Sequence, residues 1–129
     1  MSLAAASAEL AVADDAESVR HARHFVRIQL ARWSVGATVA ADAVLLASEL
    51  VTNALRHGAA PRQLELELTN SRLRIAVRDA GPDSPRRQPP VADREGGRGL
   101  ALLEALSADW GTDTQPTDGK RVWCDLVVG

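Results

Sequence analysis

The stretch ADAVLLASELVTNALRHG, residues 41–58, decides the fold. Its apolar residues recur at helical spacing, and Gly58 follows them as a C′ glycine that ends a helix. Two polar residues, Glu49 and Asn53, interrupt the apolar pattern four positions apart, so they share one face of the predicted helix. Taken alone, this pair is also what the solvent side of an amphipathic helix would show.

Regular elements are predicted on both sides of this helix. In chain order they are a strand at 8–12, helices at 14–33 and 39–57, strands at 63–68 and 73–78, a helix at 100–106, and strands at 110–114 and 120–128. The pair at 63–78 alternates apolar and polar residues around a short turn, which is typical of an antiparallel hairpin. The order predicts one domain over 1–129 of the α+β class, a two-layer sandwich with helices on one face of a mixed, mostly antiparallel sheet.

Composition excludes several classes of function. With 46% hydrophobic and 25% charged residues, the chain reads as a soluble globular domain. A net charge of -2 argues against a nucleic-acid binder, and the scarcity of aromatic residues disfavours a stacking platform for single strands. The single cysteine, Cys124, predicts a core thiol and a cytoplasmic location. No segment is expected to cross a membrane, because Asp42, Glu49 and Glu104 break the apolar stretches.

Two further places combine residue types that can bind ligands. Asp79 ends a predicted strand and Gly81 opens the following loop, where the aspartate either caps a turn or accepts a hydrogen bond from a ligand amine. Gly97 and Gly99 precede a helix, where backbone N–H groups and the helix dipole suit phosphate; flexible-loop glycine is the alternative. The segment 82–96 between them is longer than an ordinary connection.

Together these patterns resemble a known family. Glu-x-x-x-Asn on a helix, strand-Asp-x-Gly, a long loop, Gly-x-Gly-Leu at a helix start and a Gly-led last strand occur in the order of the GHKL, or Bergerat-fold, ATP-binding superfamily. The Asn-Ala and His-Gly pairs and the Gly-Lys-x-Val-Trp ending look most like the stand-alone anti-sigma-factor serine/threonine kinases. The resemblance covers about 10–128 and implies a histidine kinase-like ATPase fold with ATP and Mg²⁺ as cofactors.

The resemblance also implies roles for individual residues. Asn53 matches the ligand of Mg²⁺, and Glu49 matches the general base that accepts a proton from a partner's hydroxyl or from water. Asp79 matches the acid that binds the adenine amino group, with Gly81 beside the base. The segment 82–96 corresponds to the ATP lid, and Gly97 and Gly99 match the second glycine box, whose backbone approaches the phosphates. Arg94 and Arg98, as sources of positive charge, and Leu100 are the other positions expected near the nucleotide.

Two positions depart from the family pattern. Asp83 stands where the first glycine box often has a second glycine, and Lys120-Arg121 follow Gly119 where a threonine is common. Two functions therefore stay open. One is a protein kinase that phosphorylates a Ser or Thr of an antagonist protein and holds a sigma factor; the other is a non-catalytic, nucleotide-dependent switch that grips a partner. A degenerate domain that binds no nucleotide is the third reading. The expected partners are proteins, including a second copy in a homodimer, rather than nucleic acid or membrane.

Overall fold

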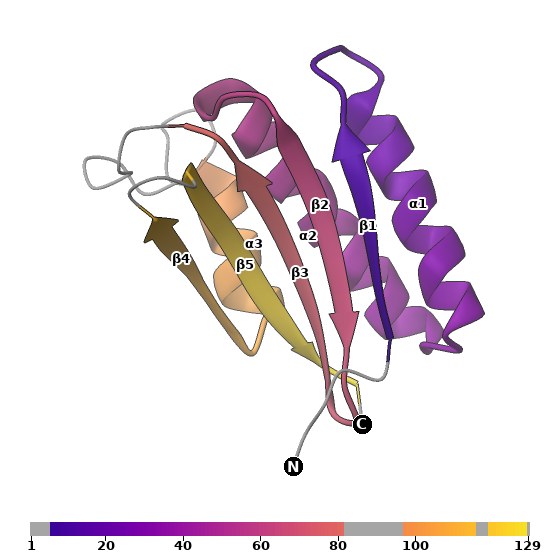
Figure 1. The fold of residues 1–129 in the computed structure, drawn as a ribbon. Coiled ribbons are helices and arrows are strands. Elements are labelled where there is room, and N and C mark those ends of the chain that lie inside the picture. The colour runs from indigo at the N-terminus through magenta and orange to yellow at the C-terminus, as the bar shows by residue number, and fades with distance from the viewer. Residues whose placement is uncertain (1–5, 82–96, 116–118, 129) are drawn as a thin grey trace.

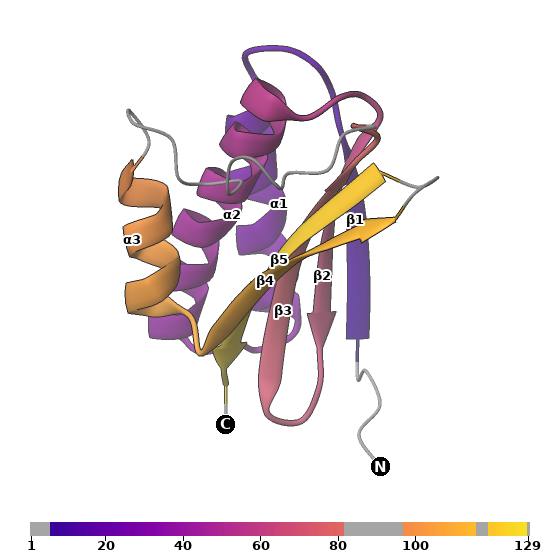
Figure 2. The same cartoon turned by 90° about the vertical axis from the view of Figure 1, so that its left-hand side faces the viewer.

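The computed structural model describes residues 6–81, 97–115 and 119–128. The elements in these ranges are β1 (Ala6–Val12), α1 (Ser18–Arg32), α2 (Ala37–His57), β2 (Arg62–Leu68), β3 (Arg72–Asp79), α3 (Gly97–Leu106), β4 (Asp109–Gln115) and β5 (Gly119–Val127). The strands form one sheet in the order β1-β2-β3-β5-β4, and each neighbouring pair is antiparallel. Helices α1, α2 and α3 all cover the same face of that sheet (Figures 1 and 2). The predicted two-layer α+β fold is confirmed.

The core lies between this helical layer and the inner face of the sheet. Helix α2 is central, because it packs on β3 and β5 and contacts both α1 and α3. Its buried apolar side chains face alternate residues of the hairpin, as the helical and strand periods require. The fully or almost fully buried side chains that meet there are Leu46, Ala47, Leu50, Val51, Leu64, Leu66, Leu73, Ile75 and Val77.

Helix α2 also corrects one expectation about the membrane. By length and composition alone, this 21-residue helix is apolar enough to cross a membrane, although Asp42 and Glu49 lie within it. Core helices of globular proteins pass the same test, and half of the apolar window is buried inside this fold. The apolar character of α2 is used here in packing against the sheet.

The end of α2 differs from the prediction. Gly58 has an extended backbone, with φ −103° and ψ −171°, rather than the left-handed conformation of a C′ glycine. The reason for glycine is a close approach, since a Cβ at Gly58 would lie 2.5 Å from Cγ of Asp79. The last carbonyls of the helix are satisfied by Arg62, whose Nε donates to Ala54 O at 2.8 Å and whose Nη2 donates to Gly58 O at 3.1 Å.

Other boundaries differ less. The helix expected to open at Leu100 begins at Gly97, so the glycines form its first turn instead of preceding it. Strand β1 begins at Ala6 and α2 begins at Ala37, each slightly before the predicted start. Such shifts are normal for element ends, which periodicity locates less well than element centres.

Candidate functional site

Four element ends meet at one end of the molecule. The C-terminal ends of α2 and β3 and the N-terminal ends of α3 and β5 all lie there, on the side from which residues 82–96 are connected (Figures 1 and 2). The antiparallel register of β3 and β5 places Asp79 directly opposite Lys120. The topology thus brings residues from three distant parts of the sequence to one place.

Asp79 is the most deeply buried carboxylate of this region. Its side chain is 2% exposed, and its Oδ1 accepts hydrogen bonds from the N–H of Gly81 at 2.7 Å and of Ala59 at 3.3 Å. Its Oδ2 lies 3.4 Å from Nζ of Lys120, which is itself 6% exposed. A carboxylate taken out of water needs such compensation, which the lysine and the two N–H groups provide together.

Three glycines enclose Asp79, and each is required by a short distance. A Cβ at Gly58 would meet the carboxylate at 2.5 Å, and a Cβ at Gly81 would lie 2.8 Å from Oδ1. Gly119 has φ +81°, and a Cβ there would lie 2.0 Å from the backbone oxygen of Asp79. Of these three glycines, only Gly81 was predicted to be a site residue. The His-Gly pair and the Gly-Lys pair were the signals for the other two glycines.

Glu49 and Asn53 lie along one edge of α2. Ser48, on the opposite edge, accepts a 3.3 Å hydrogen bond from Nε of Arg23 on α1. Glu49 and Asn53 therefore face away from α1, toward the side on which α3 packs. Asn53 is 7% exposed and Glu49 is half-buried, and neither side chain has a hydrogen bond or ion pair within the described residues.

The structure brings together some of the predicted residues and leaves others apart. Asp79, Gly81 and Lys120 are in mutual contact, and the Gly58-Ala59 segment connects them to the end of α2. Within the described residues, no hydrogen bond or ion pair joins Asp79 to Asn53 or Glu49. The positions 97–100 form the first turn of α3. Arg94, Asp83 and the predicted lid, 82–96, lie outside the described residues.

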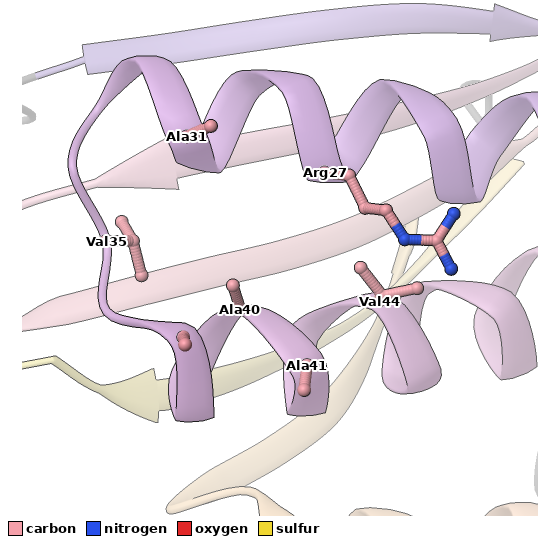
Figure 3. A pocket seen from close by; sticks show the side chains of 7 residues that line it. Arg27, Ala31, Val35, Ala40, Ala41 and Val44 are labelled. Atoms are coloured by element: carbon pink, nitrogen blue, oxygen red, sulfur yellow. The ribbon is translucent and has the colours of Figure 1, made fainter.

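A separate groove lies on the other edge of α2. It occupies about 520 Å³ between α1 and α2 and opens beside the guanidinium of Arg27 (Figure 3). Small apolar side chains make up the rest of its lining: Ala31, Val35, Ala37, Ala40, Ala41 and Val44. Because it faces α1 rather than Asp79, this groove is not the predicted nucleotide site.

The residues present fit a nucleotide with Mg²⁺. Among residues 6–81, 97–115 and 119–128, no three or more His, Cys, Asp or Glu side chains gather in a metal-binding group. Mg²⁺ bound beside nucleotide phosphates takes few protein ligands, since water and phosphate oxygens supply the others. The amide oxygen of Asn53, on the edge of α2 that faces away from α1, is a ligand of that kind.

Comparison with known proteins defines the class. The profile of the histidine kinase-like ATPase domain matches residues 12–124, so the chain belongs to this family, within the GHKL superfamily. Membership supports an ATP-binding regulatory role and leaves the particular substrate open. The search of curated proteins gave no match.

A solved structure agrees with this class. The chain is similar to the histidine kinase domain of the blue-light activated histidine kinase from Erythrobacter litoralis EL346, with 28% identity and a TM-score of 0.51. The alignment covers 70% of this chain and 45% of that chain. The chain thus spans less than half the length of the kinase structure that it matches, and the two share the ATPase fold.

Proposed function

We propose that this protein is a Mg²⁺-ATP-dependent protein kinase of the anti-sigma-factor type. In this proposal it phosphorylates a Ser or Thr of an antagonist protein in the cytoplasm and holds a sigma factor. The observation that carries the proposal is the Glu49 and Asn53 pair, which lies one turn apart on the edge of α2 that faces away from α1. Family membership and the enclosed Asp79 support the ATP-binding part.

Each residue has a defined task in this function. ATP with Mg²⁺ supplies the transferable phosphoryl group. The amide oxygen of Asn53 is the protein ligand of the ion, and the carboxylate of Glu49 accepts the proton of the attacking hydroxyl. Asp79 accepts a hydrogen bond from the base in the space that Gly58 and Gly81 keep free of side chains. The first turn of α3 offers the positive end of a helix dipole to the phosphates.

The direct test is phosphoryl transfer from labelled ATP, in Mg²⁺, to a candidate antagonist. Glu49→Gln should lower the transfer rate at least about 100-fold, within the range of general-base catalysis, and leave the Kd for ATP within about threefold. Glu67→Gln is the matched control, because Glu67 is an exposed carboxylate on β2. Full transfer by Glu49→Gln would remove Glu49 as the base.

A calorimetric titration tests the metal ligand independently. Asn53→Ala should abolish the part of the ATP affinity that depends on Mg²⁺ and should leave the metal-free affinity unchanged. An unchanged titration in Mg²⁺ would show that Asn53 does not bind the ion.

A non-catalytic switch is the second candidate function. It is favoured by the Lys120 and Asp79 pair, which departs from the family pattern at the base site. In this function the binding of ATP alters the affinity for a protein partner, but ATP is not hydrolysed or transferred. Recovery of intact ATP after prolonged incubation, together with a partner affinity that changes at least about tenfold with ATP, would select the switch over the kinase.

A further inference from the structure

Lys120 differs from every other basic residue of the chain. The 15 Lys and Arg residues include a single lysine, and it is the residue placed against Asp79. A buried ammonium is costly unless it is paired and hydrogen-bonded. Lysine also carries a compact charge whose three donors can rotate, whereas the arginine fork is rigid. The choice of lysine at this one position therefore favours a task that needs a small, adjustable donor.

The ammonium of Lys120 has one ion pair and no hydrogen bond among the described residues. Its Nζ lies 3.4 Å from Oδ2 of Asp79, and within the described residues the ammonium makes no hydrogen bond. Oδ1 of Asp79 already accepts two backbone N–H groups, whereas Oδ2 has only this ion pair. Counting the described residues alone, one acceptor oxygen and one donor nitrogen thus lie side by side with further hydrogen-bonding capacity.

The same two groups border the space beside Gly81. A Cβ at Gly81 would lie 2.8 Å from Oδ1 of Asp79 and 3.5 Å from Nζ of Lys120. Glycine at this position therefore keeps a side chain away from both groups. In the proposed function this is where the base lies.

We propose that Lys120 extends the base site to 6-oxo purine nucleotides. This inference rests on the proposed ATP-binding function. A carboxylate only accepts hydrogen bonds and an ammonium only donates them. Adenine presents an amino donor at position 6, which suits Asp79, whereas guanine and hypoxanthine present an oxygen acceptor there, which suits Lys120. With both groups adjacent, the site takes purine nucleoside triphosphates of either kind.

The expected effect is large enough to measure. A site with only an acceptor at this point would leave the 6-oxo group unpaired against a carboxylate, and sites built on a hydrogen bond reject a mismatched analogue by roughly 10⁴. A lysine that donates to the oxygen removes most of that discrimination. The wild-type protein should therefore bind ITP within about tenfold of ATP.

Calorimetric titrations with ATP and with ITP in Mg²⁺ test the inference, because hypoxanthine carries an oxygen in place of the amino group of adenine. Lys120→Thr keeps a hydroxyl donor but removes the ammonium, and it should raise the preference for ATP over ITP at least about tenfold. Arg121→Thr is the matched control, since Arg121 pairs with Glu65 on the other face of the sheet and should leave the preference unchanged.

A second measurement uses the wild-type protein in case Lys120→Thr does not fold. Isotope-labelled lysine gives one side-chain NMR signal, because Lys120 is the only lysine. Saturating ITP or ATP should shift that signal. An unmoved signal at saturation, or a wild-type preference for ATP above about tenfold that Lys120→Thr does not change, overturns the inference. Binding of ATP without ITP overturns it and leaves the proposed function standing, whereas binding of neither nucleotide overturns both.

Discussion

Two ion pairs connect the same two strands, β3 and β5, and they are built differently. Both pairs are directly opposite in the register, Arg74 with Asp125 and Asp79 with Lys120, but they lie on opposite faces of the sheet. The outer pair is bidentate, with Nε to Oδ1 at 2.7 Å and Nη2 to Oδ2 at 2.9 Å. The inner pair has a single contact of 3.4 Å.

The outer pair uses its hydrogen-bonding capacity within the protein. Arg74 also lies 4.0 Å from the ring centroid of Trp123, and that ring covers Gly111, where a Cβ would lie 2.9 Å away. Hydrogen bonding to Asp125 raises the pKa of Arg74 above its ordinary value, which is the sign of a stabilised charge. These contacts indicate that the outer pair stabilises the pairing of β3 with β5.

The inner pair has a single ion contact between its side chains among the described residues, and glycines enclose it. A structural pair would gain from shorter contacts and from side chains packed around it, and here three glycines prevent that packing. Local arrangements that give up stability in this way are expected at functional sites. We therefore expect the outer pair to contribute mainly to stability and, under the proposed function, the inner pair to contribute to nucleotide binding.

The largest expected effect is on nucleotide affinity. Asp79→Asn replaces the carboxylate at the base with an amide and should weaken ATP binding at least about 100-fold, or roughly 2.7 kcal/mol. Asp125→Asn, the equivalent change in the outer pair, should leave the Kd within about threefold. Calorimetry measures both, and circular dichroism confirms that each variant is folded. Equal losses in the two variants would contradict the division of roles.

A neutral residue at 79 leaves Lys120 buried and uncompensated, so instability alone has to be excluded. The double variant Asp79→Asn, Lys120→Met removes that charge as well. It should remain folded and still fail to bind ATP. Recovery of ATP binding in the double variant would show that the single change acted through stability.

The free energy of unfolding should depend on the outer pair, whereas nucleotide affinity should not. Asp125→Ala breaks the bidentate pair and should lower the free energy of unfolding by about 2 kcal/mol, which is less than for a fully buried pair because Arg74 keeps 34% exposure. Urea unfolding measures the change, and ATP affinity of the folded variant should be retained. A loss below about 0.5 kcal/mol would place the outer pair among ordinary surface ion pairs.

The glycine at the end of α2 should matter for the inner pair alone. Gly58→Ala has a permitted backbone, but its Cβ would lie 2.5 Å from Asp79, so the carboxylate has to move. We expect ATP affinity to fall about tenfold, or roughly 1.4 kcal/mol. Gly36→Ala, at the other end of α2, is the matched control because a Cβ there meets nothing within 4 Å. Similar effects of the two changes would mean that Gly58 ends the helix and has no specific role beside Asp79.

Much of the fold was predictable because periodicity reports burial. The alternation of Leu64, Leu66 and Leu68 placed a strand correctly, and the stripe through α2 located the central helix. Gly58 shows the limit of such patterns, since helix-end statistics predict a left-handed residue whereas the structure has an extended one. The cause is a contact with Asp79, which is distant in the sequence, so a local sequence pattern cannot predict it.

The candidate site was predictable in part for the same reason. Glu49 and Asn53 share a helix edge because their spacing requires it, and Asp79 with Gly81 ends a strand as expected. The partner of Asp79 was not predicted. Lys120 was noted only as a departure from the family, because its place opposite Asp79 depends on the pairing of two strands that are not consecutive in the chain.

A further expected effect concerns Cys124, whose inner-face side chain precedes Asp125 of the outer pair in the chain and reports on the opening of β5. Burial raises the pKa of this thiol from 9.0 to about 12, so at pH 8 the folded protein should react with a thiol reagent much more slowly than the unfolded chain. Below pH 9 the thiol is neutral in both the folded and the unfolded state, and the fold keeps its full stability. As the pH rises from 9 toward 12, stability is lost because only the unfolded thiol ionises.

Breaking the outer pair should accelerate this reaction in proportion to the lost stability, if labelling requires opening of the sheet. Asp125→Ala, at about 2 kcal/mol, should therefore react roughly 30-fold faster than the wild type, because each 1.4 kcal/mol is a factor of ten in an equilibrium. Saturating ATP binds only the folded state and should slow the reaction in both proteins. Labelling that is fast in the wild type, or that Asp125→Ala does not change, would mean that β5 opens without breaking the outer pair.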